Sequence, residues 1–126
     1  MNDRNSMSDG CRRVLLLEQN SSIAKFLSII LRKSGFDVMV EGAINGKDLS
    51  SDFDLAILSS AMLLNKLPEI ESLRRRLPSR IILYGPDFYS KELARKLGAH
   101  AFLEEFYEPD KLIDAIKTVI GTSHCK

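Results

Sequence analysis

Short apolar runs that alternate with amphipathic helical stretches constrain the fold of this chain more than any other feature. Continuous apolar runs of this kind are typical of strands buried on both faces. Between them, apolar residues recur with the helical period, as they do from Ile23 to Leu31. Strands that alternate with helices predict an α/β fold, a doubly wound five-stranded parallel sheet. The five predicted strands span 14–17, 36–40, 53–58, 80–83 and 99–103.

Several residues mark where the helices begin and end. Asn20 can cap the start of the first helix, and Gly35 stands where a left-handed stop is expected. The first helix is predicted to bury Ile23, Phe26, Leu27, Ile30 and Leu31.

Length and composition indicate one domain. The chain has 126 residues, 44% of them hydrophobic and 28% charged, which is enough to build a core. We expect a flexible arm at 1–10, the domain at 11–121 and a tail at 122–126. No apolar run approaches the ~18 residues of a membrane span, and no secretory leader opens the chain. We therefore expect a cytoplasmic protein with no membrane partner.

Charge and cysteine content exclude further classes. The net charge of +1 is too balanced for a protein whose main task is to hold nucleic acid. The basic run Arg74–Arg76 is interpreted as a solvated helix face. The two cysteines, Cys11 and Cys125, form neither a disulfide framework nor a zinc motif.

In a doubly wound sheet, functional residues gather at the carboxyl ends of the strands. Several motifs occur in one order at and between these strand ends: Val14–Gln19, Asn45-Gly46, Asp54–Ser59, Lys96–Leu103 and Glu108–Leu112. With the order and spacing of the elements from about Arg13 to Ile120, they resemble the receiver domain of bacterial response regulators. The resemblance implies strand order 2-1-3-4-5 in a flavodoxin-like three-layer sandwich, and a role in two-component signalling.

The residues at the matched chemical positions depart from the family. By resemblance, Ser59 stands at the phosphoacceptor position, Glu18 and Gln19 at the acidic pocket, and Glu105 at the conserved lysine. A serine hydroxyl is a poor nucleophile without a base, and magnesium is usually held by carboxylates. We therefore expect a pseudo-receiver that is not an enzyme, with no catalytic residue, no cofactor, no metal site and weak or absent magnesium binding.

The resemblance places Tyr84 and Phe102 at the switch positions of the fourth and fifth strands. We expect Tyr84 to fill the acidic pocket and to donate a hydrogen bond to Glu18. Phe102 lacks a hydroxyl that could form a hydrogen bond when the ring turns outward. Ser59 is expected to cap the loop that follows its strand, and phosphorylation of Ser59 by a Ser/Thr kinase stays an alternative.

Only seven residues separate Gly46 from Asp54, fewer than receivers usually have there. This spacing predicts a shortened or missing second helix. One side of the second and third strands would then be thinly covered, and an exposed apolar patch there could bind a partner.

In receivers, the face formed by the fourth helix, fifth strand and fifth helix docks partners. The resemblance assigns this role to Phe88, Arg95, Tyr107 and Lys111. Exposed aromatic residues ringed by cations suit protein contact. We predict a signalling protein as partner at this face, and a homodimer through the same face is a second option.

The predicted function is therefore that of a phosphorylation-incompetent, receiver-like domain of a bacterial phosphorelay that works through protein–protein interaction. Two alternatives stay open. One is an atypical but working phosphoacceptor receiver, which a carboxylate at position 59 would favour. The other is a small-ligand sensor that uses the altered acidic pocket, which a cavity beside Tyr84 would favour.

Overall fold

A five-stranded, all-parallel sheet forms the centre of the molecule, with the strand order β2-β1-β3-β4-β5. The computed structural model describes residues 13–43, 48–63, 67–85, 88–104 and 108–121. The predicted fold class and strand order are confirmed, whereas the predicted arm (1–10) and tail (122–126) lie outside the described residues. The strands are β1 (Arg13–Leu17), β2 (Asp37–Glu41), β3 (Leu55–Ser59), β4 (Ile81–Tyr84) and β5 (Ala101–Leu103).

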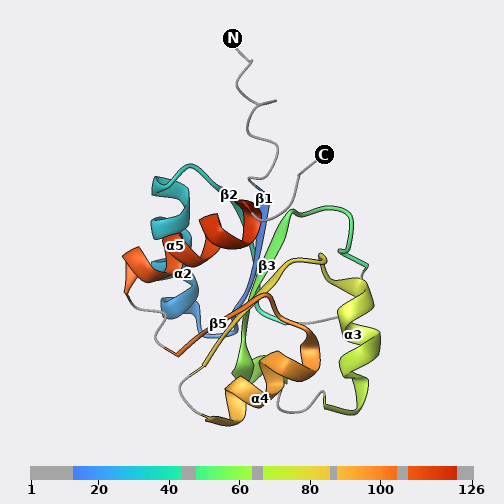
Figure 1. Cartoon of the computed structure of the whole chain (residues 1–126). Helices are drawn as coiled ribbons and strands as arrows, with labels where there is room; N and C mark the ends of the chain where they lie inside the picture. The colour runs from blue at the N-terminus through green and yellow to red at the C-terminus, as the bar shows by residue number, and fades with distance from the viewer. Residues whose placement is uncertain (1–12, 44–47, 64–66, 86–87, 105–107, 122–126) are drawn as a thin grey trace.

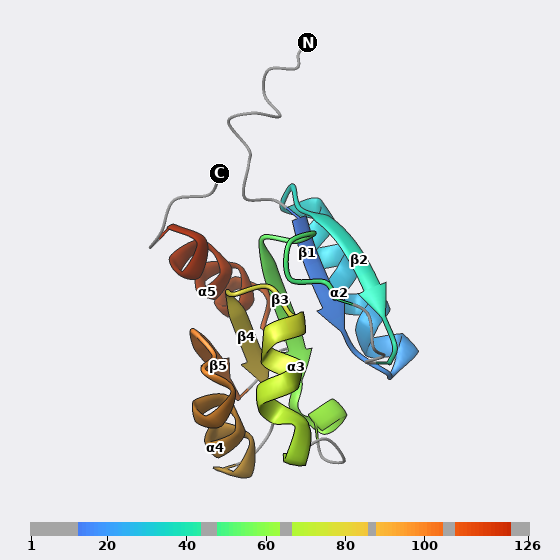
Figure 2. The same cartoon turned by 90° about the vertical axis from the view of Figure 1, so that its right-hand side faces the viewer.

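Helices cover both faces of the sheet, as Figures 1 and 2 show. Helices α2 and α5 pack on one face, and α3 and α4 pack on the other. Each face has its own apolar cluster, because alternate residues of β1 and β3 point to opposite sides. The helices are α2 (Ser21–Lys33), α3 (Ile70–Arg76), α4 (Phe88–Leu97) and α5 (Pro109–Gly121). Single 3-10 turns, η1 (Ser60–Leu63) and η2 (Leu67–Glu69), precede α3.

The predicted helix ends are confirmed where the structure describes them. The Asn20 side chain accepts a hydrogen bond from the Ile23 N–H at 3.0 Å and so caps α2. Gly35, after α2, and Gly98, after α4, have φ angles of 96° and 77°, which favour glycine. One prediction about α2 was wrong: Phe26 is 40% exposed, because it lies at the outer margin of the apolar stripe.

The connection between β2 and β3 contains no helix in its described parts, 42–43 and 48–54. Instead, Phe53 is buried and Leu49 packs against the same apolar cluster. The Leu49 N–H donates to the Arg76 carbonyl at 2.7 Å, which ties the connection to the end of α3. All of β3 is buried, so the thin cover predicted for this strand was wrong. On β2, the side chain of Met39 is left without such cover and is 44% exposed.

Among the described residues, no helix combines the length and apolar character that crossing a membrane requires.

Candidate functional site

Three polar residues meet at the carboxyl edge of the sheet, where parallel strands end together. Glu18 follows β1, Ser59 ends β3 and Tyr84 ends β4. The register pairs Leu17 with Leu58 and Ser59 with Tyr84, so the three residues lie on adjacent strands. All three are buried, none with more than 7% of its surface exposed. Buried polar groups need partners, and these three supply them to one another.

Glu18 is fixed at both of its carboxylate oxygens. Tyr84 Oη donates a short hydrogen bond to Glu18 Oε1, which is the hydrogen bond predicted from the sequence. The Asn20 N–H donates to Glu18 Oε2 at 2.9 Å. Because Asn20 also caps α2, the carboxylate is tied to the start of that helix.

Ser59 belongs to the same buried network. Its Oγ accepts a hydrogen bond from the Ala61 N–H at 3.3 Å, so it caps the loop after β3 as predicted. Burial first, and then the hydrogen bond and charge of Glu18, raise the pKa of Tyr84 well above its ordinary value, although a hydrogen bond with Ser59 opposes the shift. Tyr84 is therefore a neutral phenol that donates a hydrogen bond to Glu18. Both oxygens of the Glu18 carboxylate are engaged in this way, so Glu18 is not available as a base for Ser59.

The residues present do not fit a magnesium ion. Mg²⁺ demands octahedral oxygen coordination, usually with carboxylate ligands. Among the residues that the structure describes, Glu18 is the carboxylate at this site; both of its oxygens are in hydrogen bonds, and its neighbours supply an amide (Gln19) and a hydroxyl (Ser59). Asp54 is close to Ser59 in sequence but lies at the opposite edge of the sheet, before β3. There its carboxylate accepts a hydrogen bond from the Arg13 N–H at 2.9 Å. It therefore cannot replace Ser59 at the carboxyl edge.

A second buried contact, which the sequence analysis missed, joins β3 to α4. The hydroxyl oxygens of Ser60 and Ser90 lie 2.7 Å apart in a buried hydrogen bond. Gly85 packs against both, since a Cβ at that position would lie 2.2 Å from each hydroxyl oxygen. The Gly85 N–H also donates to the Leu103 carbonyl at 3.1 Å, so this corner joins β3, β4, α4 and β5. Gly85, directly after a strand, is the signal that could have pointed to this close packing.

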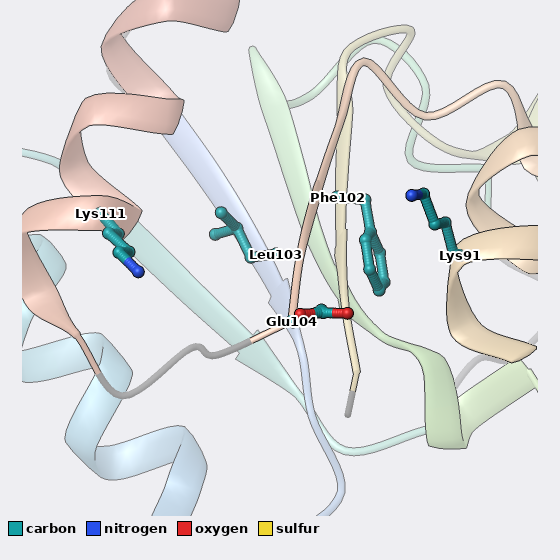
Figure 3. A pocket seen from close by; sticks show the side chains of 5 residues that line it. All are labelled: Lys91, Phe102, Leu103, Glu104 and Lys111. Carbon is teal, nitrogen blue, oxygen red and sulfur yellow. The ribbon is translucent and has the colours of Figure 1, made fainter. Parts of the chain in front are cut away.

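The face formed by α4, β5 and α5 has a pocket of about 530 Å³ (Figure 3). Phe102 and Leu103 come from β5, with Lys91 of α4 on one side and Lys111 of α5 on the other. Glu104 completes the lining. Lys111 Nζ also lies 3.2 Å from the Glu108 carboxylate.

The other predicted interface residues are not all brought to this pocket. Arg95 is exposed on α4, where it forms an ion pair with Glu92 and does not line the pocket. Phe88 is the first residue of α4, and its side chain lies outside what the structure describes. Tyr107 and Glu105 lie outside the described residues.

Comparison with known proteins returns receiver domains among the solved structures. One is a response regulator signal receiver domain from Bermanella marisrubri, with 26% identity and a TM-score of 0.70 over 86% of this chain and 97% of that one. Another is a CheY-like receiver domain protein from Methanospirillum hungatei, at 17% identity and a TM-score of 0.67, over 85% and 91% of the two chains.

A third is the receiver domain of a sensor histidine kinase from Pseudomonas aeruginosa, at 15% identity and a TM-score of 0.66, covering 87% of this chain and 98% of that one. That structure has a magnesium ion coordinated in its active site cleft. No protein-family model and no curated protein matches this chain.

Proposed function

We propose that this chain, which has the fold of the response regulator receiver domains of two-component signalling, is a phosphorylation-independent protein-interaction module. The observation that carries the proposal is the buried hydrogen bond from Tyr84 to Glu18. It occupies the pocket in which a receiver would hold its magnesium ion and phosphoryl group.

Two properties of the pocket oppose phosphoryl transfer. Ser59 is buried and its hydroxyl is engaged by Ala61 and Tyr84, so a phosphodonor would have to displace these partners. Among the described residues, the hydroxyl also has no available base, which a serine nucleophile needs. The domain we propose is therefore not an enzyme and needs no cofactor or metal.

The same contacts support a single conformation of the partner-binding face. In the proposed module, the Ser60–Ser90 hydrogen bond holds α4 against the end of β3, and Tyr84 is buried and hydrogen-bonded to Glu18. The pocket between α4 and α5 then offers Phe102 and Leu103 as its apolar lining, with Lys91 on one side and Lys111 on the other. A cytoplasmic signalling protein with an acidic, partly apolar surface suits this face, where we also place Phe88, Arg95 and Tyr107.

The alternatives receive less support. A working phosphoacceptor would need a nucleophile other than the buried hydroxyl of Ser59. A ligand sensor could use the cavity of about 360 Å³ that Glu18 and Gln19 line beside α2, but both carboxylate oxygens of Glu18 are already engaged in hydrogen bonds.

Phosphotransfer is tested by incubating the protein with magnesium and a small phosphodonor, and then measuring its intact mass. We expect the mass to stay unchanged. A stable phosphate located on Ser59 would contradict the proposal.

The interaction face is tested with immobilised wild-type and Lys111→Glu protein as baits. We expect the wild type to retain its partner equally with and without the phosphodonor, because the face does not change. Lys111→Glu should lose the partner with an unchanged thermal midpoint, whereas Lys117→Glu, an exposed residue of α5 outside the pocket, should retain it. Binding that requires the phosphodonor would contradict the proposal.

A further inference from the structure

The large apolar side chains that the described part of the chain exposes gather on one side of the molecule. Phe26 and Ile29 of α2 are 40% and 46% exposed, and Met39 and Val40 of β2 are 44% and 38% exposed. Helix α2 and strand β2 are adjacent, and β2 is an edge strand of the sheet (Figure 2). We call this surface the α2–β2 edge. Gathered apolar side chains of this kind commonly mark an interaction site.

The short β2–β3 connection explains why the edge is bare. Successive residues of a strand point to opposite faces, so Met39 points to the α3 side and Val40 to the α2 side. On the α3 side, 42–43 and 48–54 supply no helix over β2. On the α2 side, Val40 lines an open cavity with Lys25 and Ser28. Both faces of β2 therefore keep an apolar residue in contact with solvent.

The charges of the α2–β2 edge are divided between its two elements. Helix α2 has Lys25, Arg32 and Lys33 and no acidic residue. Strand β2 has Asp37 and Glu41 and no basic residue. Asp37 forms a loose exposed pair with Arg13, 3.9 Å away. The α2 side of one copy is thus complementary in charge to the β2 side of another.

One backbone contact argues against simple strand addition at this edge. Arg32 Nη2 donates to the Val38 carbonyl at 3.1 Å and so occupies an acceptor of β2. Charged side chains on an edge strand are a common protection against strand pairing. An extended peptide of any sequence is therefore a poor fit, and contacts between side chains are favoured.

We propose that the α2–β2 edge binds a second copy of this chain. In an isologous dimer the same patch serves both subunits, so the α2 cations of each copy face the β2 acids of the other. Ile29, Met39 and Val40 supply apolar contacts along the seam, Val40 on the α2 face of the sheet and Met39 on the α3 face, and the charges supply the rim. The proposal does not depend on the function assigned above, and it leaves the α4–β5–α5 face free for another protein.

The test is a mixing experiment with two charge-reversed variants, read by sedimentation between about 1 and 500 µM. Lys25→Glu with Lys33→Glu makes both elements of the edge acidic, and Asp37→Lys with Glu41→Lys makes both basic. We expect the wild type to dimerise and each variant alone to bind itself more than tenfold more weakly. An equimolar mixture of the two should form a heterodimer, since each α2 then meets a β2 of opposite charge.

Two further proteins control for net charge and for folding. Lys96→Glu with Lys117→Glu makes the same change in net charge at exposed positions of α4 and α5 and should dimerise like the wild type. Ile29→Glu should weaken the dimer more than tenfold through the apolar centre, even if a charge variant folds poorly. A monomeric wild type throughout this range, a dimer unaffected by these variants, or a mixture that does not associate would each overturn the proposal.

Discussion

At the level of single residues, Tyr84 determines what the carboxyl edge can do. Its hydroxyl supplies the donor that the buried carboxylate of Glu18 requires. Unlike a magnesium ion, a tyrosine is part of the chain and is present in every folded molecule. The buried carboxylate is therefore stabilised by a hydrogen bond from within the chain, and this stabilisation does not depend on any ligand.

Tyr84→Phe removes the hydroxyl that forms hydrogen bonds with Glu18 and Ser59, and it leaves the buried Glu18 with one fewer partner. We expect a loss of about 1–3 kcal/mol in the free energy of unfolding, measured by urea denaturation. Adding Glu18→Gln to Tyr84→Phe should recover part of the loss, because a neutral amide costs less to bury than a carboxylate. Equal stability of wild type and Tyr84→Phe would show that this hydrogen bond contributes nothing.

The raised pKa of Tyr84 predicts a specific pH dependence. Above the ordinary pKa of 10.0, the tyrosine ionises in the unfolded chain but stays protonated in the folded one. The unfolded state then binds fewer protons, so stability falls as pH rises, by about 1.4 kcal/mol per pH unit for this group. Below pH 10 the contribution is fully present. The free energy of unfolding of the wild type and of Tyr84→Phe is measured between about pH 9 and 11. Above about pH 10 it should fall more steeply in the wild type than in Tyr84→Phe. Parallel curves would refute the assignment.

At the level of elements, the corner around Gly85 holds α4 in place. The Ser60–Ser90 hydrogen bond crosses from the end of β3 to the first turn of α4 directly against this glycine. The corner links the buried pocket to the element that carries one side of the proposed partner face. In the proposed module, a rigid Gly85 corner keeps the partner-binding face of α4, β5 and α5 in one conformation.

Gly85→Ala tests this packing. The new methyl group would overlap both hydroxyl oxygens, which should destabilise the protein by about 1–3 kcal/mol and loosen the start of α4. Hydrogen exchange of the α4 amides, compared with those of α5, measures the local effect. The addition of Ser60→Ala should restore part of the stability, and an unchanged α4 in Gly85→Ala would contradict the proposed role of the corner.

Elements also show what sequence reasoning can and cannot supply. The strands were predictable because most contain short apolar runs, and the hydrogen bond between Tyr84 and Glu18 was expected from the receiver resemblance, which places both residues at the carboxyl edge. The Ser60–Ser90 contact could not be predicted, since it joins residues 30 positions apart in the sequence and depends on how α4 approaches the end of β3. Phe26 was misplaced because the apolar stripe of α2 is wider than the surface it covers.

At the level of the whole molecule, fold and phosphorelay chemistry depend on different residues. The receiver fold rests on apolar positions such as Leu15, Leu16, Leu55 and Ile57, which are fully buried on the two faces of the sheet. The chemistry would rest on a few residues at one edge, where Ser59, Gln19 and Tyr84 now stand. Changes at that edge leave the core intact, so a chain can keep the fold without the reaction.

The central claim is that this edge is closed to magnesium and phosphoryl groups. It is tested most directly by following the backbone amides by NMR while magnesium, and then beryllofluoride, is added. We expect the amide signals of Glu18, Ser59, Tyr84 and Phe102 to keep their positions, because Tyr84 is already hydrogen-bonded to Glu18 in the pocket. A saturable shift that begins at Ser59 and spreads to Tyr84 and Phe102 would contradict it and would identify a phospho-responsive switch.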